Sequence, residues 1–200
     1  MFQIHDFTNA PPITLVAEPP TSMRPNQHNK LDYSGYTDTV QVILPLGMAT
    51  GFAGISGIQD VTAGIGNSLL VGDASPNILI GGTGRNILIG GGGGDTLDAS
   101  RSQGDNILIG GRTNWDQNVT ALDAIFMEWL RTDLSFQQRL SFIQNGGDPN
   151  EPYLLNNTTV FDDGSPDVLT GGAGRNWFFA HRKNDMITNF KTGSDHTTPI

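Results

Sequence analysis

A nine-residue period runs through most of the chain from Gly54 onward. Five units follow one another between residues 54 and 98: GISGIQDVT, AGIGNSLLV, GDASPNILI, GGTGRNILI and GGGGGDTLD. After a two-residue insertion come RSQGDNILI at 101–109 and the fragment GGRTN at 110–114, and DDGSPDVLT, GGAGRNWFF and AHRKNDMIT then fill 162–188. A short fixed period of this kind predicts a stack of similar units, each touching its neighbours.

Each unit divides into a loop and a strand. Glycine with Asp or Asn fills positions 1–6, which suits a turn that needs positive φ angles, and positions 7–9 suit only a short strand. We expect residues TTVF at 158–161 to supply the strand that GGRTN lacks. Position 8 is then apolar in every unit and predicts the buried stripe: Val61, Leu70, Leu79, Leu88, Leu97, Leu108, Val160, Leu169, Phe178 and Ile187.

The composition excludes several other classes of protein. Glycine supplies 26 residues, and 17 of the 20 acidic residues are Asp, which fits tight loops and hard cations. The net charge of −9, with 11 scattered basic residues, argues against binding to nucleic acid. The absence of Cys rules out disulfides and thiolate zinc sites. We find no apolar run long enough for a transmembrane segment, and the first 20 residues do not look like a cleaved signal peptide.

Catalytic motifs are weak, and we expect no enzyme and no catalytic residues. Ser56 lacks the second glycine of a nucleophile elbow, and the glycines at 81–84 are not followed by the elements of a nucleotide site. The four His residues do not have the spacing of a zinc protease.

The units match the pattern G-G-x-G-x-D-x-U-x, which GGGGGDTLD at 90–98 fits at every position. They resemble the hemolysin-type calcium-binding repeat, or RTX repeat, of secreted bacterial toxins, proteases and adhesins. The resemblance covers residues 54–114 and 158–195. It implies an all-β fold, a right-handed parallel β-roll in which two units make one turn and calcium lies between loops stacked along one edge.

The resemblance also implies which residues would bind calcium, namely loop carbonyls and the side chains at position 6. The best loop contains Gly90, Gly91, Gly93 and Asp95, and the second contains Asp162, Asp163 and Asp167. The loop of Asp185 has no glycine and carries Arg182 and Lys183, whose positive charge would weaken a site. Because two units make one turn, loops of alternate units share an edge. We therefore expect Asp167 to stack on Asp185 and Asp95 to stack on Asn77.

Most of the other position-6 residues are asparagine: Asn77, Asn86, Asn106 and Asn176. Asparagine keeps an oxygen ligand and tolerates the left-handed conformation, but it lacks the charge that makes a calcium site tight. Two outcomes therefore remain open, at least one calcium site or a metal-free ladder of stacked asparagine side chains.

The rest of the chain surrounds or interrupts the repeats. Residues 1–30 are interpreted as a Pro-rich linker or disordered arm, 31–53 as lead-in strands, 54–114 as the first part of the roll, 115–157 as a two-helix insertion, and 158–195 as the continuation and C-terminal cap. Apolar residues at helical spacing predict helices at 119–130 and 136–143, the second capped by Asp133 or Ser135 and ended by Gly146-Gly147.

An outer face of the roll is strongly apolar. Six residues at positions 7 and 9 would form it: Leu69, Val71, Ile87, Ile89, Ile107 and Ile109. We expect the two helices to cover this face. The alternative is an exposed adhesive face, with the helices capping the end of the stack.

The resemblance implies a non-catalytic, extracellular or cell-surface module that binds calcium ions and assists the folding and export of a bacterial surface or secreted protein. Its partners would be calcium and cell-surface components or the rest of a larger protein. Two alternatives are a metal-independent structural or adhesive tail and an accessory domain of a secreted hydrolase or epimerase encoded elsewhere.

Overall fold

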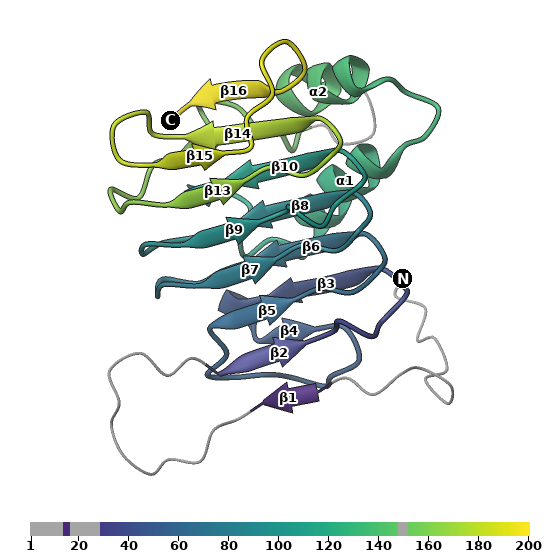
Figure 1. The fold of residues 1–200 in the computed structure, drawn as a ribbon, viewed down its shortest axis with the longest axis vertical. Coiled ribbons are helices and arrows are strands. Elements are labelled where there is room, and N and C mark those ends of the chain that lie inside the picture. The colour runs from purple at the N-terminus through teal and green to yellow at the C-terminus, as the bar shows by residue number, and fades with distance from the viewer. Residues whose placement is uncertain (1–13, 17–28, 148–151) are drawn as a thin grey trace.

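The computed structural model describes residues 14–16, 29–147 and 152–200, which form two seven-stranded sheets, one two-stranded sheet and two α-helices (Figure 1). The strands of the first sheet are β1 (Thr14–Val16), β2 (Lys30–Asp32), β5 (Asp60–Thr62), β7 (Ile78–Ile80), β9 (Thr96–Asp98), β13 (Val168–Thr170) and β15 (Met186–Thr188), adjacent in that order. Apart from β1 and residues 29 and 30, the N-terminal arm of the sequence analysis lies outside the described residues.

The second sheet lies against the first. Its strands are β3 (Val40–Ile43), β4 (Met48–Ala49), β6 (Ser68–Val71), β8 (Asn86–Ile89), β10 (Asn106–Ile109), β14 (Asn176–Ala180) and β16 (His196–Pro199), with a short 3-10 helix, η1 (Leu44–Leu46), before β4. They are ordered β16-β14-β10-β8-β6-β3-β4.

The nine-residue period explains this arrangement, because consecutive units alternate between the two sheets. Strands one full turn apart therefore become parallel neighbours, as when Val61 of β5 pairs with Leu79 of β7. The antiparallel pairs of the two sheets are β1 with β2 and β3 with β4, both at the N-terminal end. We call the two sheets and their connecting loops the repeat stack.

Position 8 forms the core between the sheets, as the sequence predicts. Leu70, Leu79, Leu88, Leu97 and Leu108 are all fully buried there. Ile187, near the C-terminal end, is only partly buried against the same cluster.

Most of the segment between β10 and β13 lies outside the repeat stack, whereas the sequence predicted that part of it forms a strand of the stack. β9 pairs directly with β13, and β10 with β14, so residues 110–161 contribute no strand to either sheet. Instead, β11 (Arg112–Thr113) pairs antiparallel with β12 (Val160–Phe161). The prediction that residues 158–161 complete a unit of the stack was wrong, because Val160 packs into the apolar cluster of the insertion and not between the sheets.

Two helices, α1 (Val119–Leu130) and α2 (Phe136–Asn145), cover the outer face of the second sheet (Figure 1). Ile87 and Ile89 are each 1% exposed, so the covering hypothesis is confirmed and the exposed-face alternative was wrong. Of the two proposed caps, Ser135 caps α2 and forms a capping box with Gln138, and Gly146 follows the helix.

Polar contacts fix the helices to the loops of the repeat stack. Arg85 donates hydrogen bonds to the carbonyls of Leu130 and Arg131 at the end of α1, at 3.0 and 2.7 Å. Arg139 of α2 is 1% exposed and forms an ion pair with Asp105, which also accepts the Arg175 amide at 2.9 Å.

Neither helix in the described parts of the chain has the length and apolar character needed to cross a membrane.

Candidate metal centre

The loops of the repeat stack line two edges with different position-6 residues. Loops that lead from the second sheet into the first form the aspartate edge, whose position-6 residues are Gln59, Asn77, Asp95, Asp167 and Asp185. Loops that lead from the first sheet into the second form the asparagine edge, whose position-6 residues are Ser68, Asn86, Asn106, Asn176 and Asp195.

Hydrogen bonds join the position-6 residues of the aspartate edge into a column. The amide of Asn77 donates to Oδ1 of Asp95 at 2.8 Å, and the amide of Asp95 donates to Oδ1 of Asp167 at 2.8 Å. The amide of Asp167 donates to Oδ1 of Asp185 at 3.1 Å. Each carboxylate thus uses one oxygen to hold the preceding loop of the stack.

This column corrects the stacking expected from the sequence. Asp167 does stack on Asp185, but Asp95 stacks on Asp167 as well as on Asn77. The expected order was wrong because it counted residues 110–161 as one strand of the stack. Three consecutive aspartates therefore lie along one edge.

The second oxygens of two of these aspartates have no partner. Asp95 and Asp167 are 2% and 1% exposed, and Oδ2 of each is buried without a hydrogen bond from any residue that the structure describes. Oδ1 of Asp162 is a third such oxygen. Burying unpaired carboxylate oxygens is costly, so these atoms are suited to a cation.

A local change in hydrogen bonding leaves Oδ2 of Asp95 free. In the loops of Asn77 and Asp185, the amide at position 2 donates to the position-6 side chain, at 2.8 and 2.7 Å. In loop 90–95 the position-2 amide, that of Gly91, donates instead to the carbonyl of Gly111 at 2.9 Å.

Burial and neighbouring negative charge raise the pKa values of these carboxyl groups. Burial raises the pKa of Asp95 to about 8 against the lowering effect of the Asn77 amide, and the charge of Asp167 adds to the rise. Burial likewise raises the pKa of Asp167 to about 7, with the charge of Asp185 contributing. The pKa of Asp185 is also raised by burial. The column thus carries more negative charge than its protein surroundings stabilise.

Glycines bring the backbone of loop 90–95 close to its neighbours. Gly91 and Gly93 have φ angles of 94° and 95°, and a Cβ at Gly91 would lie 2.3 Å from the carbonyl oxygen of Asp73. A Cβ at Gly90 would lie 2.4 Å from the unpaired oxygen of Asp95. These contacts explain why glycine occupies these positions.

The carbonyls of this loop are a second source of oxygen ligands. Within the described residues, no donor forms a hydrogen bond with the carbonyl oxygens of Gly91, Gly92 or Gly93. Also within those residues, no group of three or more acidic or His side chains is arranged to hold a metal ion. A cation at this edge would therefore need carbonyl as well as carboxylate oxygens.

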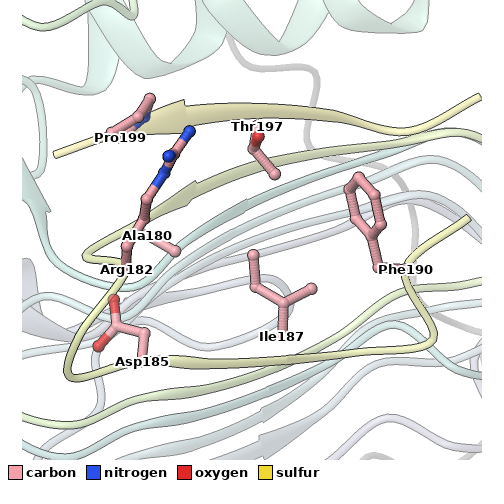
Figure 2. Close-up of a pocket in the computed structure, with 7 residues that line it drawn as sticks. All are labelled: Ala180, Arg182, Asp185, Ile187, Phe190, Thr197 and Pro199. Carbon is pink, nitrogen blue, oxygen red and sulfur yellow. The ribbon is translucent and has the colours of Figure 1, made fainter. Parts of the chain in front are cut away.

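Asp163 and Asp185 are more fully engaged than the sequence suggested. Oδ2 of Asp163 accepts the Gly93 amide at 2.7 Å, which links loops 90–95 and 162–167. Asp185 lines an open pocket of about 360 Å³ at the C-terminal end of the stack, and the Arg182 side chain extends away from its carboxylate (Figure 2). The expectation that the charge of Arg182 and Lys183 weakens a calcium site in this loop stays a prediction.

The asparagine edge is a ladder of side-chain amides. Asn86 Nδ2 donates to Oδ1 of Asn106 at 2.8 Å, and Asn106 Nδ2 donates to Oδ1 of Asn176 at 2.9 Å. All three residues are fully buried, and Ser68 extends the ladder by donating to Asn86 at 2.7 Å. The structure places these three predicted ligands on the opposite edge from Asp95, with their side-chain oxygens already bonded.

Sequence reasoning missed Asp195, which ends this ladder. Its two carboxylate oxygens each accept Asn176 Nδ2 at 3.2 Å. The signal was its position, because Asp195 follows Asn176 by about one turn and occupies position 6 of a unit with few consensus residues.

A family model describes the same repeats. The RTX calcium-binding nonapeptide repeat matches residues 62–97 and 156–187, in four copies. The chain carries RTX repeats. No match to the chain was found among curated proteins.

The two edges differ in the oxygen ligands that they offer to calcium, the metal named for RTX repeats. At the aspartate edge, the unpaired oxygens of Asp95 and Asp167 and the loop carbonyls are the hard oxygen ligands that calcium prefers. At the asparagine edge, neutral amides satisfy one another. The RTX repeats of this chain therefore have one edge with oxygens available to calcium and one edge whose side-chain amides bond one another.

Proposed function

We propose that this chain is a non-catalytic extracellular module, a right-handed parallel β-roll whose aspartate edge binds calcium. The observation that supports it best is the pair of buried, unpaired oxygens on Asp95 and Asp167. Asp162 and the carbonyls of Gly91 and Gly93 would complete the ligand set. Bound calcium would supply the positive charge that this edge lacks, which favours the ionised carboxylates.

Metal binding would couple this edge to folding. The two aspartates lie 72 residues apart in sequence and come together only when the repeats stack. Calcium would therefore bind the folded chain in preference to the unfolded one and stabilise it by mass action. Outside a cell, where calcium is abundant, this would favour the folded state and so assist folding and export of a larger surface or secreted protein.

Thermal unfolding followed by circular dichroism tests this proposal. A calcium concentration 100-fold above the dissociation constant adds about 2.7 kcal/mol, so we expect millimolar calcium to raise the midpoint by about 5–10 °C over excess chelator. Magnesium at the same concentration is the matched control, because it holds its water and prefers stricter octahedral sites. Coincident melts in calcium and chelator would overturn the proposal.

A metal-independent structural tail is the second candidate. The buried ladder of Asn86, Asn106 and Asn176 supports it, because these three side chains bond one another without charge. Coincident melts would favour this function instead.

A further inference from the structure

The ammonium group of Lys191 lies among the carbonyls of a neighbouring loop. Its Nζ donates hydrogen bonds to the carbonyl oxygens of Gly172 at 2.7 Å, Ala173 at 2.8 Å and also Gly174. Oδ1 of Asp195 lies 3.9 Å from the same nitrogen. Three carbonyls and one carboxylate thus surround a single positive charge.

These oxygens come from two stacked loops of the asparagine edge. The carbonyls belong to loop 171–176, and Asp195 occupies position 6 of the last loop at this edge that the structure describes. Oδ1 of Asp195 accepts the amide of Asn176 at 2.9 Å, and Oδ2 accepts the amide of Lys191 at 2.9 Å. Loop carbonyls combined with a carboxylate are the kind of oxygen ligands that a hard divalent cation prefers.

Earlier loops at this edge satisfy their carbonyls with neutral groups. Ser102 Oγ donates to the carbonyl of Gly84 at 2.6 Å, and the amide of Gln103 donates to the carbonyl of Thr83 at 2.8 Å. Both donors come from the next loop of the stack. Lys191 fills the same role for loop 171–176, but it does so with a charged group.

We propose that the Lys191 ammonium is a tethered cation that takes the place of a divalent metal ion between loops 171–176 and 190–195. The loop pair is a latent metal site, and Lys191 keeps it closed without metal. A neutral residue at position 191 leaves the three carbonyls and Asp195 without their cation and opens the site to calcium. This inference concerns the asparagine edge and does not depend on calcium binding at the aspartate edge.

The test compares Lys191→Met with wild type and with Lys30→Met, a lysine of β2 at the N-terminal end of the stack whose partly exposed side chain pairs only with Asp32 among the ion pairs of the described residues. Thermal midpoints are measured in excess chelator and in millimolar calcium, and bound calcium ions are counted by calorimetric titration. In chelator, we expect the thermal midpoint of Lys191→Met to lie about 2–4 °C below that of wild type. In calcium, we expect the two midpoints to coincide and the variant to bind one ion more than wild type. Lys30→Met should match wild type in both measurements, because an exposed ion pair contributes little.

An unchanged midpoint, a loss that calcium does not restore, or an unchanged ion count would each overturn the inference. Adding Asp195→Asn to Lys191→Met should abolish the gained ion. If Lys191→Met does not fold in either buffer, Lys191→Gln is titrated instead, with the same outcomes. A wild type that binds no calcium beside a variant that gains one ion would contradict the proposed function while supporting this inference.

Discussion

The amide of Asp95 donates a 2.8 Å hydrogen bond to Oδ1 of Asp167, although the insertion separates the two residues in sequence. This bond places two buried carboxylates in successive loops of one edge. The bond uses Oδ1 of Asp167. Oδ2 of Asp167 and Oδ2 of Asp95 have no hydrogen-bond partner among the described residues. Burial, with a smaller contribution from neighbouring carboxylates, raises the pKa values of both residues, and the unpaired oxygens are suited to a cation.

The first prediction concerns the pH dependence of the calcium-free protein. The folded-state pKa values of Asp95 and Asp167 are about 8 and about 7, above the ordinary value of 3.8. The folded state then binds more protons than the unfolded state between these values, so the free energy of unfolding falls as pH rises. We expect the thermal midpoint in chelator to be highest in mild acid and to decrease up to about pH 8.

Variants show whether these two groups cause the slope. Asp95→Asn and Asp167→Asn should each flatten the pH profile, whereas Asp38→Asn, at an exposed position, should preserve it. A profile that rises from pH 5 to pH 8 in wild type would contradict the raised pKa values.

The second prediction concerns the asparagine edge. Asn106→Ala removes the acceptor of Asn86 and the donor to Asn176, both in fully buried surroundings. Each buried polar group left unpaired costs about 1–3 kcal/mol. We expect urea unfolding to show the same loss of free energy in calcium and in chelator. Asn145→Ala, at an exposed position, is the control and should lose little stability. A loss that appears only in calcium would show that this edge binds metal.

The third prediction concerns the ion pair between the insertion and the repeat stack. Arg139→Met leaves Asp105, which is 8% exposed, without its closest cation. Breaking a buried ion pair from one side costs about 3–5 kcal/mol. We expect a loss near the lower figure in urea unfolding, because Arg175 Nε remains 3.5 Å from Asp105.

A second substitution separates the lost charge from the lost packing. Adding Asp105→Asn to Arg139→Met should recover part of the stability, because it removes the unpaired charge. Asp133→Asn, which breaks an exposed ion pair with Arg131, should have little effect. If Arg139→Met and Asp133→Asn are equally stable, the ion pair does not anchor the helices.

The fourth prediction concerns the apolar face under the helices. Trp129 is fully buried against this face, and Trp→Ala changes in cores cost about 3–5 kcal/mol. Trp129→Ala should lose about that much stability and bind more of a hydrophobic dye. Met127→Ala, on the same helix but 66% exposed, should do neither. Equal dye binding by the two variants would argue against a covering role.

Much of the fold could be predicted from the period and from local residue chemistry. Position 8 identified the leucines between the sheets, and apolar spacing identified α1 and α2, with Ser135 as one of two candidate caps for α2. These features depend on neighbours within a few residues or one to two repeats away, so the sequence displays them directly.

The stacking across the insertion could not be predicted in this way. The period counts units, but it does not say whether residues 158–161 join a sheet or pair with residues 112–113 outside it. That choice reversed which loops share an edge and hid the contact between Asp95 and Asp167. The unpaired oxygens depend on individual hydrogen bonds, such as that from Gly91 to Gly111, which no residue pattern reports.

The most direct test of the account is a calorimetric calcium titration of wild type and of Asp95→Asn/Asp167→Asn. Wild type should bind calcium, and the double variant should lose that binding while remaining folded by circular dichroism, because its amides can form a ladder like that of the other edge. Equal calcium binding by the two proteins, or none by wild type, would contradict the claim that the aspartate edge is the calcium site.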